Sequence, residues 1–216
     1  DNRAMLTLVS IERIWNELCR IIVGKNVDVV LSRMNKDGVL SAIIGYPLPS
    51  NIFELVAKLP EDMEARIALL LSNLKSNEVE EVLKRLKASK KVLNRSKKLH
   101  FLIHNTPDLH DLRIYRNELG KEVRTHIDLR NIIGEDTSLI VKSLQYPIEI
   151  NCLIDGDWLM EKTGLGPGLK LGRLKDWLFR IQIERGYTEV SQIETALCTT
   201  SWTHGDPKQW PKPKWP

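Results

Sequence analysis

Residues 10–24 have the sequence SIERIWNELCRIIVG, and this stretch decides the fold class. Its apolar side chains recur at intervals of three and four positions, which is the spacing of one face of an α-helix. Ser10 is a residue type that caps helix N-termini, and Gly24 is one that ends helices. The sequence therefore predicts a helix between these two residues, with an apolar stripe made of Ile11, Ile14, Trp15, Leu18, Ile21 and Ile22.

The same periodicity continues along most of the chain. Asn77 with Glu80, and Thr106 before Pro107, fit the patterns of helix N-caps. The best strand candidate, residues 146–154, is interpreted as an extended approach to the next helix. We therefore expect an all-α fold, with further helices over residues 27–35, 51–59, 61–74, 78–93 or beyond, 107–119 and 123–133.

Length and composition are those of a folded, soluble chain. With 216 residues and 42% hydrophobic content, it can build one large or two small cores. No stretch approaches the roughly 20 uncharged apolar residues of a membrane helix, and no basic segment followed by an apolar one marks a signal peptide. A net charge of +4, from 32 basic and 28 acidic residues, is too small to establish a nucleic-acid partner by itself.

The cysteines indicate a reducing compartment. Cys19, Cys152 and Cys198 are widely spaced and odd in number, which fits neither a disulfide framework nor a C-x-x-C metal site. We expect an intracellular protein, cytoplasmic by default, with a mitochondrial location left open. The chain begins with Asp1 and not with Met, so we expect that further sequence precedes it.

A glycine-rich stretch occupies residues 154–178, with the sequence IDGDWLMEKTGLGPGLKLGRLKDWL. Asp155 is placed to cap a short helix ending at Gly164, and Pro167 to begin a long helix that runs to about Gly186. Glycines at the N-terminus of the long helix let a phosphate approach the free N–H groups there, and cations follow them. The predicted RNA-binding residues are Gly166, Gly168, Gly172, Arg173 and Lys175.

The glycines of this stretch can equally serve close packing between two crossing helices, and this alternative stays open. Their spacing matches neither the G-x-x-x-x-G-K-[ST] phosphate loop nor a dinucleotide fold, which needs a preceding buried strand. Asp155 and Asp157 have the spacing of D-x-D magnesium ligands, but helix capping is favoured. His100, His104 and His110 complete no metal coordination sphere, so we assign no catalytic or metal-binding residue.

A basic block lies between residues 84 and 98, with no acidic residue inside it. Surface helices normally mix charges of both signs, so an unmixed block favours nucleic-acid contact over a solvated helix face. The predicted RNA-binding residues of this block are Lys84, Arg85, Lys87, Lys90, Lys91, Arg95, Lys97 and Lys98.

Two of these stretches resemble motifs of one family. Residues 10–22 are similar to the pattern S-x-E-R-I-x-x-E-L-x-x-I-L of class II tRNA nucleotidyltransferases, the CCA-adding enzymes, and of the related bacterial poly(A) polymerases; Ile11 stands where a small residue is common. Residues 154–178 resemble the same family's later signature, [IV]-x-G-x-x-L-M followed by G-[IL]-x-P-G-x-x-x-G. The two motifs occur in the family's order and separation.

The resemblance implies where the chain lies in the family's order of head, neck, body and tail. It would begin at the end of the neck, without the catalytic head that binds Mg²⁺ and CTP or ATP, so this chain alone would bind no cofactor and be inactive. Glu12, Arg13 and Glu17 would support the nucleotide-templating helix, and the glycine-rich helix start and nearby cations would lie along the tRNA acceptor and TΨC arms. The implied segments are a neck end (1–24), a helical body (25–145) and a helical tail (146–199), and a terminus (200–216) follows them.

The terminus is assigned from composition. Residues 201–216 hold three of the six Trp and four of the ten Pro, without apolar periodicity, so we expect them to be disordered and dispensable for folding. The alternative is that Trp202, Trp210 and Trp215 stack on exposed bases.

We therefore expect an all-α, elongated multi-helix array that holds the 3′ end and acceptor/TΨC arm of tRNA while the head of the same polypeptide adds nucleotides. Two alternatives remain: the same region of a poly(A) polymerase, and a non-enzymatic helical module that binds protein through residues 51–145.

Overall fold

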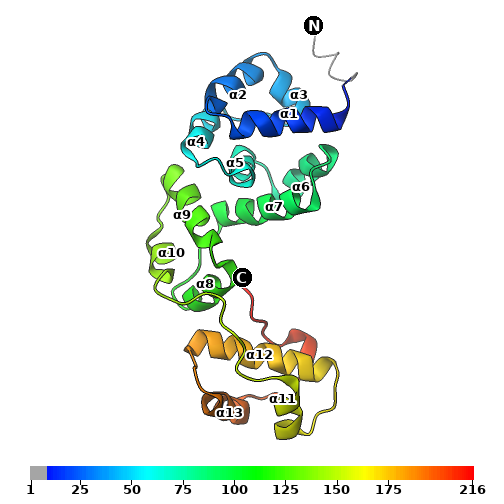
Figure 1. The fold of residues 1–216 in the computed structure, drawn as a ribbon, viewed down its shortest axis with the longest axis vertical. Coiled ribbons are helices and arrows are strands. Elements are labelled where there is room, and N and C mark those ends of the chain that lie inside the picture. Colours follow the sequence, from blue (N-terminus) through cyan, green and yellow to red (C-terminus); the bar gives the residue numbers. More distant parts are fainter. Residues whose placement is uncertain (1–8) are drawn as a thin grey trace. The chain divides into compact units, whose positions relative to one another are not determined.

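The computed structural model describes residues 9–216 and confirms the all-α fold (Figure 1). The described residues form thirteen α-helices and one short 3₁₀-helix, with no β-strand among them. None of these helices is both long and apolar enough to cross a lipid bilayer.

The helices belong to two compact units, each with its own core. Unit 1 consists of residues up to 106 together with 124–137, and unit 2 of residues 107–123 together with 138–216. The predicted body, residues 25–145, is therefore divided between both units, and its boundary at 145 does not coincide with a boundary between them. Periodicity reveals that a helix has an apolar face, but not which other helix covers that face.

Unit 1 is built around α5 (Met63–Leu70), which packs against three other helices of the unit, α1, α4 and α7. All six residues from Ala65 to Leu70 are buried, as expected for a helix that is surrounded by its neighbours. The other helices of this unit are α1 (Ile11–Val23), α2 (Val27–Lys36), α3 (Val39–Ile44), α4 (Ile52–Lys58), α6 (Ser76–Arg85) and α7 (Lys90–His104), with most of α9 (Glu122–Ile132).

Arg66 is the charged residue at the centre of this packing. It is only 5% exposed, and its guanidinium donates hydrogen bonds to the carbonyl oxygens of Leu59 at 2.7 Å, Ile22 at 2.8 Å and Gly24 at 3.3 Å. These carbonyls lie at the C-terminal ends of α4 and α1, where backbone acceptors lack helical partners. One side chain therefore satisfies the ends of two helices from a third.

The predicted helix over 78–93 is in fact two helices. α6 ends at Arg85, Lys87 adopts a left-handed backbone conformation (φ 57°), and Ser89 caps α7 by accepting a hydrogen bond from the amide of Val92 at 3.3 Å. Leu86, which caps the C-terminal end of α6, stays buried together with Val82 and Leu83 of that helix.

Two predicted caps were also wrong, and two were right. α6 begins at Ser76, with Glu78 bonded to the amide of Lys75, and α8 begins after Asp111, well beyond Pro107. Ser10 and Asp155 cap the helices assigned to them. Three helices that the periodicity did not reveal, α3, α10 and α13, are six to ten residues long.

Unit 2 is built around α12 (Leu169–Arg185). Its buried cluster joins Leu171, Leu174 and Leu178 of this helix to Leu159 of α11 and Ile193 of α13. The remaining elements are α8 (Leu112–Leu119), α10 (Ser138–Ser143), α11 (Gly156–Thr163), α13 (Val190–Thr199) and the 3₁₀-helix η2 (Pro207–Gln209). The segment over 146–154 is not a strand, in agreement with its interpretation as an extended approach.

The expectation of a disordered terminus is wrong. Trp210 is 8% exposed and belongs to the buried cluster of unit 2, with its ring 5.5 Å from that of Trp177. Arg173 of α12 donates to the carbonyl oxygens of Pro207, at 3.1 Å, and of Trp210. Because these contacts join residues distant in sequence and involve backbone acceptors, composition and periodicity could not reveal them.

We predict that Trp210→Ala lowers the free energy of unfolding by about 3 kcal/mol or more, since it empties a large site in the core of unit 2. Gln209→Ala, at an exposed neighbouring position, should change it by less than about 0.5 kcal/mol. Urea denaturation monitored by circular dichroism checks both variants. If both variants change the free energy of unfolding equally and by a small amount, this terminus is dispensable for folding.

Candidate nucleic-acid interface

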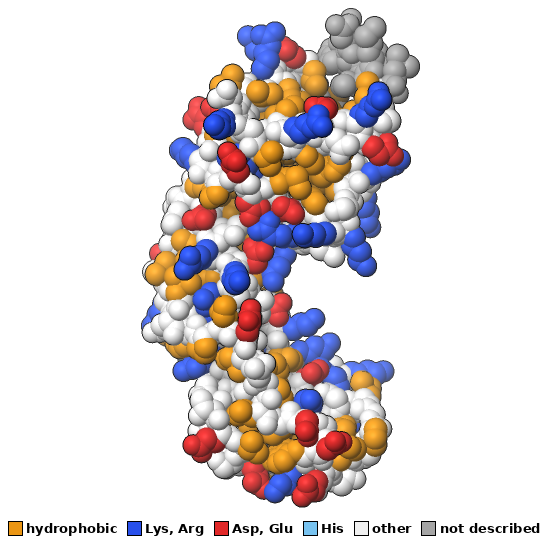
Figure 2. All heavy atoms as spheres, viewed as in Figure 1, with side chains coloured by type: hydrophobic (Ala, Val, Ile, Leu, Met, Phe, Trp, Pro, Cys, Tyr) orange, Lys and Arg blue, Asp and Glu red, His pale blue; other side chains and the backbone are white. Residues whose placement is uncertain are grey.

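The predicted basic block is distributed over α6, α7 and the turn between them. Lys84 and Arg85 end α6, Lys87 lies in the turn, and the other members belong to α7. Figure 2 shows Lys and Arg side chains gathered over this part of unit 1. The block is no longer free of acids in three dimensions, because other parts of unit 1 bring carboxylates to it.

Four of the cations are paired with carboxylates. Lys84 and Lys97 both bind Glu80 of α6, and these two ammonium groups lower the pKa of Glu80 to about 2. Arg95 binds Asp62 at 2.5 Å and Glu64 at 3.2 Å. The remaining pair, Lys87 with Glu12 at 2.5 Å, also lowers the pKa of that carboxyl.

Arg85 has a structural role. Its guanidinium donates to the carbonyl oxygens of Ile43, at 3.1 Å, and of Ile44 at the end of α3. It lies 2.5 Å from the position that a Cβ on Gly45 would take, so the left-handed glycine (φ 78°) makes room for it. To bind RNA as predicted, Arg85 and Arg95 would have to give up these hydrogen bonds and ion pairs within the protein.

Lys90 and Lys91, in the first turn of α7, are exposed and make no ion pair with a described residue. Lys98 is half-buried. Lys90 and Lys91 are thus the members of the block that can bind a phosphate without breaking an existing interaction.

The glycines at the start of α12 are open to solvent. Gly166, Gly168 and Gly172 are all exposed, and no described atom beyond the local backbone lies within 4 Å of the position a Cβ would take on any of them. The alternative that these glycines allow two helices to cross closely is therefore incorrect within the described structure. The helix itself starts at Leu169, two residues after Pro167.

The cations that follow these glycines differ in their surroundings. Arg173 is 7% exposed and is bonded to Asp176 at 2.8 Å as well as to the C-terminal carbonyls, so its predicted role as an RNA contact is replaced by a structural one. Lys175 is half-buried. Lys170, which was not predicted, lies with its Nζ 5.7 Å from the centre of the Trp202 ring.

The residues considered for metal chemistry have other partners. Asp155 accepts the amide of Trp158 at 2.9 Å, as a helix cap does. His100 and His104 donate from Nε2 to the carbonyl oxygens of Leu74 at 3.1 Å and Ser72 at 3.0 Å, since a carbonyl can only accept. Among the described residues, no group of three or more His, Cys, Asp or Glu is placed to hold a metal ion.

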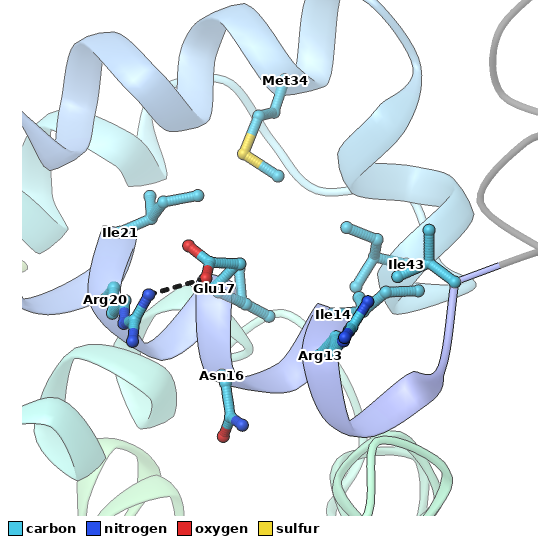
Figure 3. Close-up of a pocket in the computed structure, with 10 residues that line it drawn as sticks. Arg13, Ile14, Asn16, Glu17, Arg20, Ile21, Met34 and Ile43 are labelled. Carbon is cyan, nitrogen blue, oxygen red and sulfur yellow. Dashed lines mark hydrogen bonds and ion pairs between the residues drawn. The ribbon is translucent and has the colours of Figure 1, made fainter.

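The first family-like motif lies beside a groove. Arg13 and Glu17 line a groove of about 530 Å³ in unit 1, together with Ile14 and Ile21 of α1 and Met34 of α2 (Figure 3). Within it Glu17 binds Arg20 at 2.8 Å. Other lining side chains are Val9, Asn16, Leu18 and Ile43. The groove is mostly apolar and open, which the sequence did not predict.

We predict that the protein loses stability as the pH falls from 7 to 5. Burial, aided by Arg130, lowers the pKa of His126 to about 4 in the folded state, against 6.5 for an ordinary histidine. Between these values the unfolded chain binds the extra proton, so the free energy of unfolding falls by about 2 kcal/mol at pH 5. Urea denaturation at both pH values measures this change.

His126→Gln should reduce this pH dependence, and the part that remains comes from His100, whose pKa is also lowered by burial. His110→Gln, at an exposed position, should leave it unchanged. An unchanged slope in the His126 variant would contradict the assignment.

No family model matches the sequence, and comparisons with curated proteins and with solved structures found no match either.

Proposed function

We propose that this chain is the RNA-binding body and tail of a CCA-adding tRNA nucleotidyltransferase. The observation that carries the proposal is the open start of α12, where nothing in the described structure packs on Gly166, Gly168 or Gly172. Exposed backbone at the N-terminus of a 17-residue helix favours an anion such as a phosphate. The same residues lie within one of the two family-like motifs.

The proposed role is to position the RNA. Nucleotide addition requires the 3′ end of the tRNA to be held in a fixed geometry, and gripping a rigid RNA arm at a distance supplies it. Recognition would use shape and phosphates, because an A-form stem hides its base edges in a deep groove. Lys90, Lys91 and Lys175 are the predicted cations that form no ion pair within the described part of the chain.

The catalytic parts of this proposal lie outside the chain. Mg²⁺ and CTP or ATP would be held by a head domain of the same polypeptide, in an intracellular enzyme. The groove lined by Arg13 and Glu17 supports this part, because an open apolar surface beside the motif gives a preceding segment of the polypeptide a place to dock.

Binding to tRNA should depend on the start of α12. With about three to five phosphate contacts, the logarithm of the affinity should fall against the logarithm of the salt concentration with a slope near −3 to −4. Gly172→Glu should weaken binding at least severalfold without loss of helicity, since the new carboxylate repels phosphate and nothing is displaced. Fluorescence anisotropy with a tRNA lacking its 3′ CCA measures the affinity.

Gly156→Glu is the matched control, because Gly156 is also an open glycine at a helix start in unit 2. If both substitutions change the affinity for tRNA equally, or if the affinity of the unaltered chain does not depend on salt concentration, the start of α12 is not an RNA-binding site.

The chain by itself should add no nucleotides. Incubation with tRNA lacking its 3′ CCA, together with CTP, ATP and Mg²⁺, should give no extension, because the metal-binding carboxylates belong to the head. Templated addition by the purified chain would contradict the proposal. The same assay on a polypeptide that includes the head distinguishes CCA addition from poly(A) addition, and absence of any RNA binding would favour the protein-interaction module instead.

A further inference from the structure

We propose that residues 207–216 form a fixed basic strap that binds the phosphate backbone of RNA through Lys208, Lys212 and Lys214. The role of the strap rests on the proposed RNA-binding function and adds a second binding element to it. A segment whose composition suggested disorder thereby gains a function.

The strap is held to α12 by two arginines. Arg173 donates to the carbonyl oxygens of Pro207 and Trp210, and Arg180 donates to those of Lys212 at 3.0 Å and Lys214 at 3.1 Å. The two arginines are seven residues apart, which is about 10 Å along a helix. Figure 1 shows this segment, in red, beginning beside α12.

Two aromatic contacts complete the attachment. Trp210 lies in the buried cluster of unit 2, and the ring of Trp215 meets that of Tyr115 in α8 edge to face, with 4.9 Å between centroids. These contacts leave no free face on Trp210 for base stacking. Base stacking by this residue, one of the alternatives for the terminus, is therefore replaced by a packing role.

The cations of α12 that hold the strap are paired with acids, whereas the cations of the strap itself are not. The arginines beneath it already bind acids: Arg173 is paired with Asp176, and Arg180 with Glu184 at 2.6 Å. The strap's lysines are all exposed, and none makes an ion pair with a described residue. Backbone carbonyls thus face α12 while uncompensated ammonium groups face solvent.

This arrangement suits RNA phosphates. Nucleic-acid duplexes carry about one negative charge per 1.7 Å of axis, so three exposed lysines on one ordered segment can engage neighbouring phosphates. Four prolines in the strap remove backbone N–H groups that would otherwise need partners, and they restrict the unbound chain. Because the strap is already ordered, binding does not require ordering a flexible tail. The attachment of Pro207 to Arg173 also brings the start of the strap to the second turn of α12.

The test compares two triple variants of the full chain with equal loss of charge. Lys208→Gln, Lys212→Gln and Lys214→Gln together should weaken binding to a tRNA lacking its 3′ CCA roughly tenfold or more at about 0.1 M salt. The negative salt slope should shrink by about 2 to 3, at about 0.9 for each lost phosphate contact. The control changes Lys121, Lys142 and Arg185 to Gln; these are exposed cations of the same unit that make no ion pair with a described residue, and the variant should stay within about threefold of the unaltered chain.

A third variant, Arg180→Lys, tests the attachment at constant net charge. Arg180 bonds Glu184 through Nε and both strap carbonyls through Nη1. The shorter lysine, with one ammonium group, cannot hold the carboxylate and both carbonyls from these separate positions, so the strap should loosen and affinity should fall severalfold. Binding equal to that of the unaltered chain would show that a fixed strap is not needed.

If the two triple variants lose equal affinity for tRNA, or if the strap variant loses none, the inference about the strap is overturned. Binding of tRNA by the unaltered chain would still support the proposed function in that case. Failure of the unaltered chain to bind tRNA would instead overturn the proposed function itself. Circular dichroism and thermal unfolding of each variant exclude loss of folding as the cause.

Discussion

The hydrogen bonds between Arg66 and the ends of α1 and α4 are the constraint on which unit 1 depends. Short helices have many ends, and each end leaves carbonyl oxygens without helical partners. Placing such ends inside a core requires a donor for them, because a buried acceptor without a hydrogen bond costs roughly 1–3 kcal/mol. The guanidinium supplies several donors in a rigid plane, and each of its three nitrogens donates to a backbone oxygen here.

The same solution recurs in both units. Arg85 satisfies the end of α3, Arg130 donates to the carbonyl of Ile103 in unit 1, and Arg173 and Arg180 bind the C-terminal carbonyls in unit 2. In these examples arginine is used for joining segments that are far apart in sequence. The fork geometry of its side chain explains the choice, since lysine offers a single point charge.

This use of arginine changes where an RNA partner can bind. A cation that already holds two carbonyls, as Arg173 does, is costly to redirect toward a phosphate, whereas an exposed lysine such as Lys90 or Lys212 gives up only water. In unit 2 the proposed RNA-binding groups are therefore lysines and open backbone, and Arg173 and Arg180 hold the backbone of the segment that carries Lys208, Lys212 and Lys214. Because many cations are paired inside the protein while some exposed lysines are not, a net charge of only +4 can coexist with local positively charged surfaces.

The sequence by itself determined the all-α fold, because a stripe such as that of α1 requires only local spacing, and it determined the caps at Ser10 and Asp155, whose partners lie three residues away. It also located the glycine-rich start of α12. Only the tertiary structure decided that the block over 84–98 is broken at Lys87 and that Asp62, Glu64 and Glu12 pair with some of its cations. It also decided that residues 207–216 are packed. The physical reason is that these features depend on partners distant in the chain: a charge pattern along one helix does not show which acid another helix brings, and a proline-rich segment does not show which arginine will bind its carbonyls.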